Sequence, residues 1–146
     1  MGIVVFILVL WYGGLFFQSF FLHRYSAHQV FTMSKTMERI TFVLTWIFQG
    51  PSYLSAYGYG ILHRMHHAFT DTKKDPHSPS YDASLFAMMW KTKTIYHDIN
   101  EQRIEVDQRF VKNVPQWKSF DLFANSNFSR IFWILSYLLY FSFFVT

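Results

Sequence analysis

Charged side chains are confined to the middle of this chain of 146 residues. All 13 Lys or Arg residues and all 9 Asp or Glu residues lie between Arg24 and Arg130, so neither end carries a charged side chain. Residues 1–22 are rich in Ile, Val, Leu, Phe and Trp. As a helix they would extend about 33 Å, enough to cross a hydrocarbon core of roughly 30 Å. The sequence therefore predicts a transmembrane helix over about residues 1–22.

This first apolar segment does not look like a cleaved leader. A secretory signal peptide has a basic start, a shorter apolar core and a small-residue cleavage site, and Met1 to Phe21 has none of these. Because every Lys and Arg follows the span, the positive-inside tendency predicts that residues 24–130 face the cytoplasm. The lipid bilayer is therefore an expected partner. The net charge of +4 is explained by the same tendency, so it gives no reason to expect nucleic acid as a partner.

The last segment of the chain, from Ile131 to Thr146, is again apolar and uncharged. Its 16 residues would form about 24 Å of helix, which is shorter than a complete span. A terminal carboxylate inside hydrocarbon would be costly. We therefore expect the start of a further transmembrane helix at 131–146, in a protein that continues past this C-terminal truncation.

Residues 40–62 are also uncharged, but Gly50–Pro51 interrupts them and the second half is rich in Ser, Tyr and Gly. If this segment crossed the bilayer, the histidines before and after it would lie on opposite sides of the membrane. An interfacial, broken helix pair is therefore predicted, followed by a polar loop at 71–82 and a peripheral helix from about Ser84 to Phe110. The expected fold is an all-α integral membrane protein with a His-rich cytoplasmic cap over about residues 23–128.

Five of the seven histidines fall in two short groups, H-R-Y-S-A-H at 23–28 and H-R-M-H-H at 63–67. With His63 at 0° on a helix, His66 lies at about −60° and His67 at about +40°, so all three share one face. His23 and His28 are about 140° apart on an ideal helix. For both to reach one site, one side chain must extend around the helix or the helix must loosen.

These histidines are candidate metal ligands. The chain has no cysteine, which excludes disulfides and thiolate or iron–sulfur ligation within it. Imidazole suits iron, zinc and copper, and a histidine-dominated set argues against a closed structural zinc site. There is no H-E-x-x-H motif of a zinc protease. The predicted ligands are His23, His28, His63, His66 and His67.

The polar loop supplies weaker candidates. Asp71 and Asp75 could accept the free ring N–H of metal-bound histidines, with solvation of the helix end as the alternative. His77 could hydrogen-bond to a metal-bound histidine or lie on the substrate side of the site, or it could be a solvated loop residue. Arg24 and Arg64 could pair with those carboxylates or extend to solvent.

The stretch H-R-M-H-H-A-F-T-D-T-K-K-D-P-H at 63–77, together with the group at 23–28, closely resembles the first two histidine boxes of the acyl-coenzyme A desaturases of the stearoyl or delta-nine type. The resemblance covers about residues 10–80 and includes the spacing of roughly 35 residues between boxes. It implies a di-iron centre in which the five box histidines are ligands and O2 is a co-substrate. It also implies a fatty acyl-CoA substrate that gains a cis double bond, with electrons from cytochrome b5 or ferredoxin.

The sequence departs from that family in two places. A third box of the H-x-x-H-H type is absent, so the 146 residues are interpreted as a partial membrane desaturase domain that would not catalyse by itself. One apolar span precedes the first box where many relatives have two. Two other functions stay open: a membrane hydroxylase or alkane monooxygenase with similar boxes, and a non-catalytic membrane protein that binds metal or haem.

Overall fold

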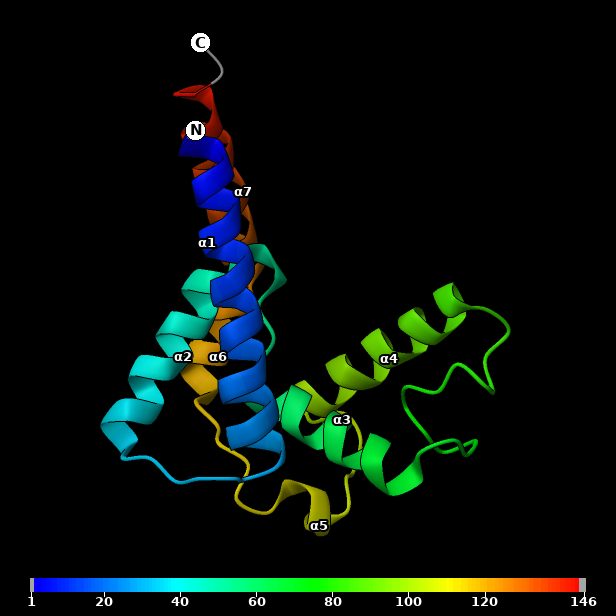
Figure 1. Cartoon of the computed structure of the whole chain (residues 1–146). Helices are drawn as coiled ribbons and strands as arrows, with labels where there is room; N and C mark the ends of the chain where they lie inside the picture. Colours follow the sequence, from blue (N-terminus) through cyan, green and yellow to red (C-terminus); the bar gives the residue numbers. More distant parts are fainter. Residues whose placement is uncertain (1, 145–146) are drawn as a thin grey trace.

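The computed structural model of the chain describes residues 2–144, and this part consists of helices joined by loops, with no strand (Figure 1). The all-α prediction is confirmed for these residues. Short 3-10 and π segments are labelled η. The elements in chain order are α1 Gly2–Phe17, η1 Gln18–Ala27, α2 Lys35–Gln49, η2 Gly50–Ser52, α3 Ala56–Phe69, α4 Leu85–Asn100, α5 Gln108–Val111, α6 Lys118–Ala124 and α7 Asn127–Ser142.

The first two elements form one continuous helix, Gly2–Ala27, of 26 residues. Within residues 2–144 it is the one helix long and apolar enough to cross a membrane, judged by length and composition. Most of its apolar surface has no protein cover, as at Val4, Leu8 and Trp11. The helix therefore includes the predicted span and continues through the first histidine group.

Helix α7 lies beside α1, so the two ends of the described chain come together (Figure 1). Phe6 stacks on Tyr140 with ring centroids 3.9 Å apart, and the Tyr140 hydroxyl donates to the Gly2 carbonyl at 3.2 Å. The helix starts at Asn127, before the predicted Ile131, because the Ser126 hydroxyl caps its first turn. The predicted span reached Thr146, which lies outside the described residues.

The predicted break at Gly50–Pro51 separates α2 from α3. Gly50 has φ +54°, where side chains are strained, and an added Cβ would collide with the Tyr137 hydroxyl. Pro51 then follows as the second residue of the single turn of η2. The chain reverses here, so α3 runs back toward the end of η1 (Figure 1). The two histidine groups consequently lie at the same end of the molecule, as the prediction required.

The peripheral helix α4 is shorter than predicted, ending at Asn100 and not near Phe110. Gln102 adopts a left-handed conformation with φ +57°, and the Arg103 N–H donates back to the Asp98 carbonyl at 2.8 Å. This arrangement closes the helix with hydrogen bonds to its last carbonyls. The chain then turns and returns through α5 to α3.

Helix α3 is packed on two sides, which fixes its position. On one side Phe21, Leu22, Phe42 and Ala56 form a buried cluster that joins it to η1 and α2. On the other side a second cluster joins it to α4 and α5 through Ile61, Ile99 and Phe110. The histidines of α3 are therefore carried by a helix that is held on two sides.

Candidate metal centre

The first histidine pair lies on a π-helical segment. In η1 the His28 N–H donates to the His23 carbonyl at 3.0 Å, an i→i+5 hydrogen bond. Such bonding widens the helix and brings residues five apart closer to the same face, and the two imidazole centroids are 4.5 Å apart. The loosened helix thus reduces the angular mismatch of an ideal helix. π-helical segments are frequent at functional sites.

The second group projects from α3, whose start is capped by Ser55 through a 2.9 Å bond from the Gly58 N–H. His63 and His67 are one turn apart, with Nε2 atoms separated by 2.9 Å. His63 Nε2 also lies 3.2 Å from His28 Nε2. Four imidazoles converge in this way, with ligand atoms all within 4.8 Å of one another, from His23, His28, His63 and His67.

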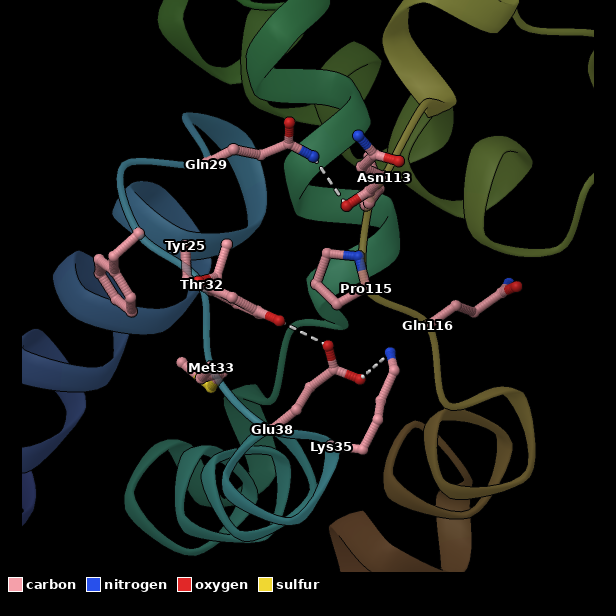
Figure 2. Close-up of a pocket in the computed structure, with 11 residues that line it drawn as sticks. Tyr25, Gln29, Thr32, Met33, Lys35, Glu38, Asn113, Pro115 and Gln116 are labelled. Carbon is pink, nitrogen blue, oxygen red and sulfur yellow. Dashed lines mark hydrogen bonds and ion pairs between the residues drawn. The ribbon is translucent and has the colours of Figure 1, made fainter.

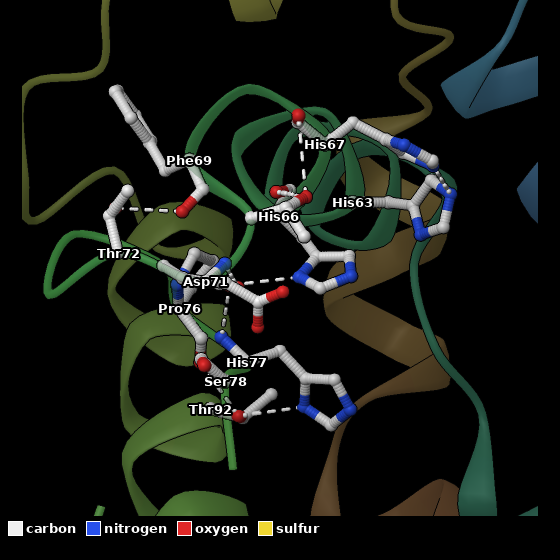
Figure 3. Close-up of polar contacts among 12 residues, drawn as sticks. His63, His66, His67, Phe69, Asp71, Thr72, Pro76, His77, Ser78 and Thr92 are labelled. Atoms are coloured by element: carbon white, nitrogen blue, oxygen red, sulfur yellow. Dashed lines mark hydrogen bonds and ion pairs between the residues drawn. The ribbon is translucent and has the colours of Figure 1, made fainter. Parts of the chain in front are cut away.

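His66, the fifth predicted ligand, is turned toward the polar loop (Figure 3). Its Nδ1 lies 2.8 Å from Asp75 Oδ1, and its ring centroid is 6.3 Å from that of His63. The structure therefore brings four of the five predicted ligands into one group. It places the fifth beside them, with Nδ1 engaged by Asp75.

Asp75 is fully buried and receives three hydrogen bonds. Besides His66, the backbone N–H groups of His77 and Asp71 donate to it at 2.8 and 3.2 Å. Burial tends to raise the pKa of this carboxyl, but the bonds from His66 and the two backbone groups outweigh it and leave the pKa below its usual value. A carboxylate at this position makes His66 Nδ1 the donor. His66 Nε2 is then free to act as a ligand.

The other two loop candidates have different positions. Asp71 has a left-handed backbone and an exposed side chain, and it meets Asp75 through its N–H. His77 contacts Thr92, with Nδ1 3.1 Å from Oγ1, while that hydroxyl donates to the Pro76 carbonyl at 2.8 Å. The Thr92 hydrogen is thus engaged, so His77 Nδ1–H is the donor and its Nε2 the acceptor. No sequence signal linked Thr92 to this site, because it is 15 residues away.

Two of the converging imidazoles are held in the neutral form. Burial, followed by the neighbouring histidines, lowers the pKa of His63 to about 4. The pKa of His28 is also lowered, by burial first and then by His23, His67 and Arg64. Neutral imidazole is the form that binds metal ions, so neither group needs to lose a proton at pH 7.

Arg64 was predicted to pair with a carboxylate or extend to solvent, and both expectations are wrong. Its guanidinium donates four hydrogen bonds to backbone carbonyls of Ser26, Ala27, Phe110 and Lys112. Such partners leave no trace in side-chain patterns. The arginine therefore links α3 to the end of η1 and to the end of α5.

An apolar cavity of about 450 Å³ opens directly beside the histidine group. Its walls include Leu54, Tyr59 and Leu62, and His63, His66 and His77 form its polar edge. Tyr59 also stacks on His63, with ring centroids 5.5 Å apart and planes within 9°. Chemically active side chains and apolar space for a ligand thus meet at one place.

A larger cavity of about 630 Å³ lies between the loop after η1 and the segment before α6 (Figure 2). Its lining is about evenly polar and apolar, and it includes the buried Glu38 carboxylate. Tyr25 and Lys35 already satisfy that carboxylate, at 2.6 and 2.9 Å. None of the predicted ligands lines this cavity, so the smaller one is the candidate site.

Comparison with known proteins gives a partial match. Over 60 residues the chain is 42% identical to the hex-5-enoyl-[acyl-carrier protein] acetylenase of Moorena producens (strain JHB). The matched stretch makes up 40% of this chain and 17% of the length of the acetylenase. No family model matches the chain, and no solved structure does. The chain is therefore similar, over this stretch, to a desaturase-like enzyme of fatty-acid modification.

Proposed function

We propose that this chain carries the first two histidine boxes of a membrane fatty-acyl desaturase, an O2-dependent enzyme that introduces a cis double bond. The observation that carries the proposal is the convergence of His23, His28, His63 and His67 beside an apolar cavity. The similarity to a fatty-acid-modifying enzyme supports the same class of reaction. The acyl-CoA substrate and the iron come from the resemblance of residues 10–80 to the desaturase boxes.

The donor set fits iron on its chemistry. The four converging ligands are all imidazoles, two of them with a lowered pKa, and a fifth imidazole has its Nδ1 committed to Asp75. His23, His28, His63, His66 and His67 would hold the metal. Bound iron supplies the activation of O2 that removal of hydrogen from an unactivated carbon requires.

The residues of this chain would position the acyl group and exclude water. Leu54, Tyr59 and Leu62 offer an apolar wall for a hydrocarbon chain next to His63. Excluding water from this cavity would protect reactive species from side reactions. Asp75 would keep His66 in one tautomer and orientation throughout turnover.

The partners of the reaction are part of the proposal. Electrons would come from cytochrome b5 or ferredoxin, and the helix Gly2–Ala27 would anchor the protein in a bilayer with the histidines on the cytoplasmic side. The acetylenase is named for an acyl group on acyl-carrier protein. The acyl carrier is therefore tested alongside the reaction.

The test uses the native protein reconstituted in lipid with an electron donor, O2 and either acyl-CoA or acyl-carrier protein thioesters. We expect an oxygen-dependent alkene from acyl-CoA, and its loss in His67→Ala. A matched control is His97→Ala, because His97 lies on α4 next to Glu101 and belongs neither to the four converging imidazoles nor to the lining of the apolar cavity. An alcohol product would instead indicate a hydroxylase. Full activity of His67→Ala would contradict the ligand assignment.

A further inference from the structure

Arg64 lies on α3 directly after His63 and makes four hydrogen bonds to backbone carbonyl groups. Its Nε donates to Ala27 at 2.7 Å and one terminal nitrogen donates to Ser26 at 2.9 Å. The other terminal nitrogen donates to Phe110 at 3.0 Å and to Lys112 at 2.8 Å. One side chain thus joins the last residues of η1, the end of α5 and α3.

The chemistry of these partners favours arginine specifically. Ser26 and Ala27 are the last residues of η1, where carbonyl groups lack partners within the helix and carry partial negative charge. The guanidinium has five N–H groups in a rigid plane, of which four are used here. A lysine ammonium has three donors at a single point and cannot bond to four carbonyls of two separate segments.

A second feature brings the same two segments together. Ala56, Gly60 and Arg64 are spaced by four residues, so they follow one face of α3. The Ser26 hydroxyl donates to the Ala56 carbonyl at 2.6 Å. A Cβ at Gly60 would collide with the Ser26 hydroxyl and come within 3.2 Å of Val114. Close approach of η1 to α3 is therefore built into this face, and Arg64 completes it.

The distance between η1 and α3 also sets the geometry of the histidines. His28 directly follows the carbonyl that Arg64 binds at Ala27, and His63 directly precedes Arg64 in the chain. Their Nε2 atoms, one from each segment, are 3.2 Å apart. Any movement of the end of η1 away from α3 would separate the two pairs of imidazoles.

We propose that Arg64 is the positioning residue of the histidine site, which holds the end of η1 against α3 so that His23 and His28 meet His63 and His67. The effect of Arg64 on metal binding rests on the proposed function. The clamp itself is a property of the metal-free chain. Arg64 acts through backbone carbonyls and is not itself a ligand.

The test measures the clamp and the metal site separately in the full chain, reconstituted in lipid nanodiscs. The chain has no cysteine, so spin labels at Ser19→Cys and Ala68→Cys report one distance, between exposed positions on η1 and α3. Double electron–electron resonance, recorded on the metal-free protein, gives the mean and the width of the distribution of that distance. Titration with Co²⁺, followed by its visible absorption, gives the affinity of the histidines. Arg24→Lys is the matched control, an exposed arginine that directly follows His23.

For Arg64→Lys we expect a broader and longer distance distribution and a Co²⁺ affinity lower by roughly 10- to 100-fold, the size of effect typical of residues that orient ligands. Arg24→Lys should have the distance distribution and the Co²⁺ affinity of the parent chain. Gly60→Ala keeps Arg64 but displaces Ser26, and should broaden the distribution as well, which covers the case that Arg64→Lys does not fold.

Wild-type distances in Arg64→Lys would overturn the proposal, whether or not the Co²⁺ affinity falls. If Arg64→Lys does not fold, wild-type distances in Gly60→Ala would overturn it. A parent chain that binds no Co²⁺ would refute the metal function alone, because the distance measurement still decides whether Arg64 clamps the two segments.

Discussion

Replacing Asp75 by Asn should destabilise the loop that supports the histidines, even without metal. Asp75 accepts three N–H donors, from His66, His77 and Asp71, on two buried oxygens. An Asn side chain has one acceptor oxygen, so its NH2 group must face a donor in either orientation. The least costly orientation keeps the bonds from His66 and His77 and turns the NH2 group toward the Asp71 N–H.

The size of the effect follows from these three bonds. Leaving the Asp71 N–H without a partner costs about 1–3 kcal/mol, and the two remaining bonds each lose about 1 kcal/mol of charge assistance. Removing a buried charge offsets part of this loss. We therefore expect the free energy of unfolding to fall by about 2 kcal/mol, which lowers Tm by about 6 °C for a chain of this size.

The measurement is thermal unfolding of the metal-free protein in detergent, followed by far-ultraviolet circular dichroism at pH 7. Asp71→Asn is the matched control, because Asp71 is exposed and Asn tolerates its left-handed backbone. The control should change stability by less than about 0.5 kcal/mol. The reasoning is refuted if Asp75→Asn has the Tm of the wild type, or if Asp71→Asn loses as much stability as Asp75→Asn.

Two further predictions concern the fold and its pH dependence. Because the folded-state pKa of His63 is lowered to about 4 from an unfolded value near 6.5, unfolding takes up a proton between these values. The free energy of unfolding of the metal-free wild type should therefore fall as pH drops through this window. It should fall less in His63→Gln. Equal dependence of this free energy on pH in the two proteins would show that His63 is not the cause. Gly50→Ala should lower Tm by several degrees, since Gly50 has φ +54° and faces Tyr137, whereas Gly14→Ala should not. Equal melting of the two glycine variants would refute the role given to Gly50.

The sequence predicted the fold where hydrophobicity and turn residues act locally. The confinement of charge between Arg24 and Arg130 predicted the exposed apolar helix, and Gly50–Pro51 predicted the break between α2 and α3. The early end of α4 was missed because Gln102 carries no strong turn signal, although it adopts a left-handed conformation. The placement of the helices in a bilayer stays a prediction.

The candidate site was predictable as far as it depends on spacing. The i, i+4 relation of His63 and His67 placed them together. The 140° mismatch of His23 and His28 left two alternatives, a side chain that extends around the helix or a helix that loosens, and the structure shows the second in a π-helical segment. The contacts of Arg64 and Thr92 were not predictable either, because their partners are backbone groups and distant residues.

The metal content of the native protein tests the central claim most directly. The protein would be isolated without oxygen or chelator, and its metals measured by mass spectrometry for the wild type, His63→Ala and the control His97→Ala. The account predicts iron in the wild type and in His97→Ala, and its loss in His63→Ala, since His63 Nε2 lies within 3.2 Å of both His28 and His67. A wild-type protein without iron, or a His63→Ala variant that keeps it, would contradict the account.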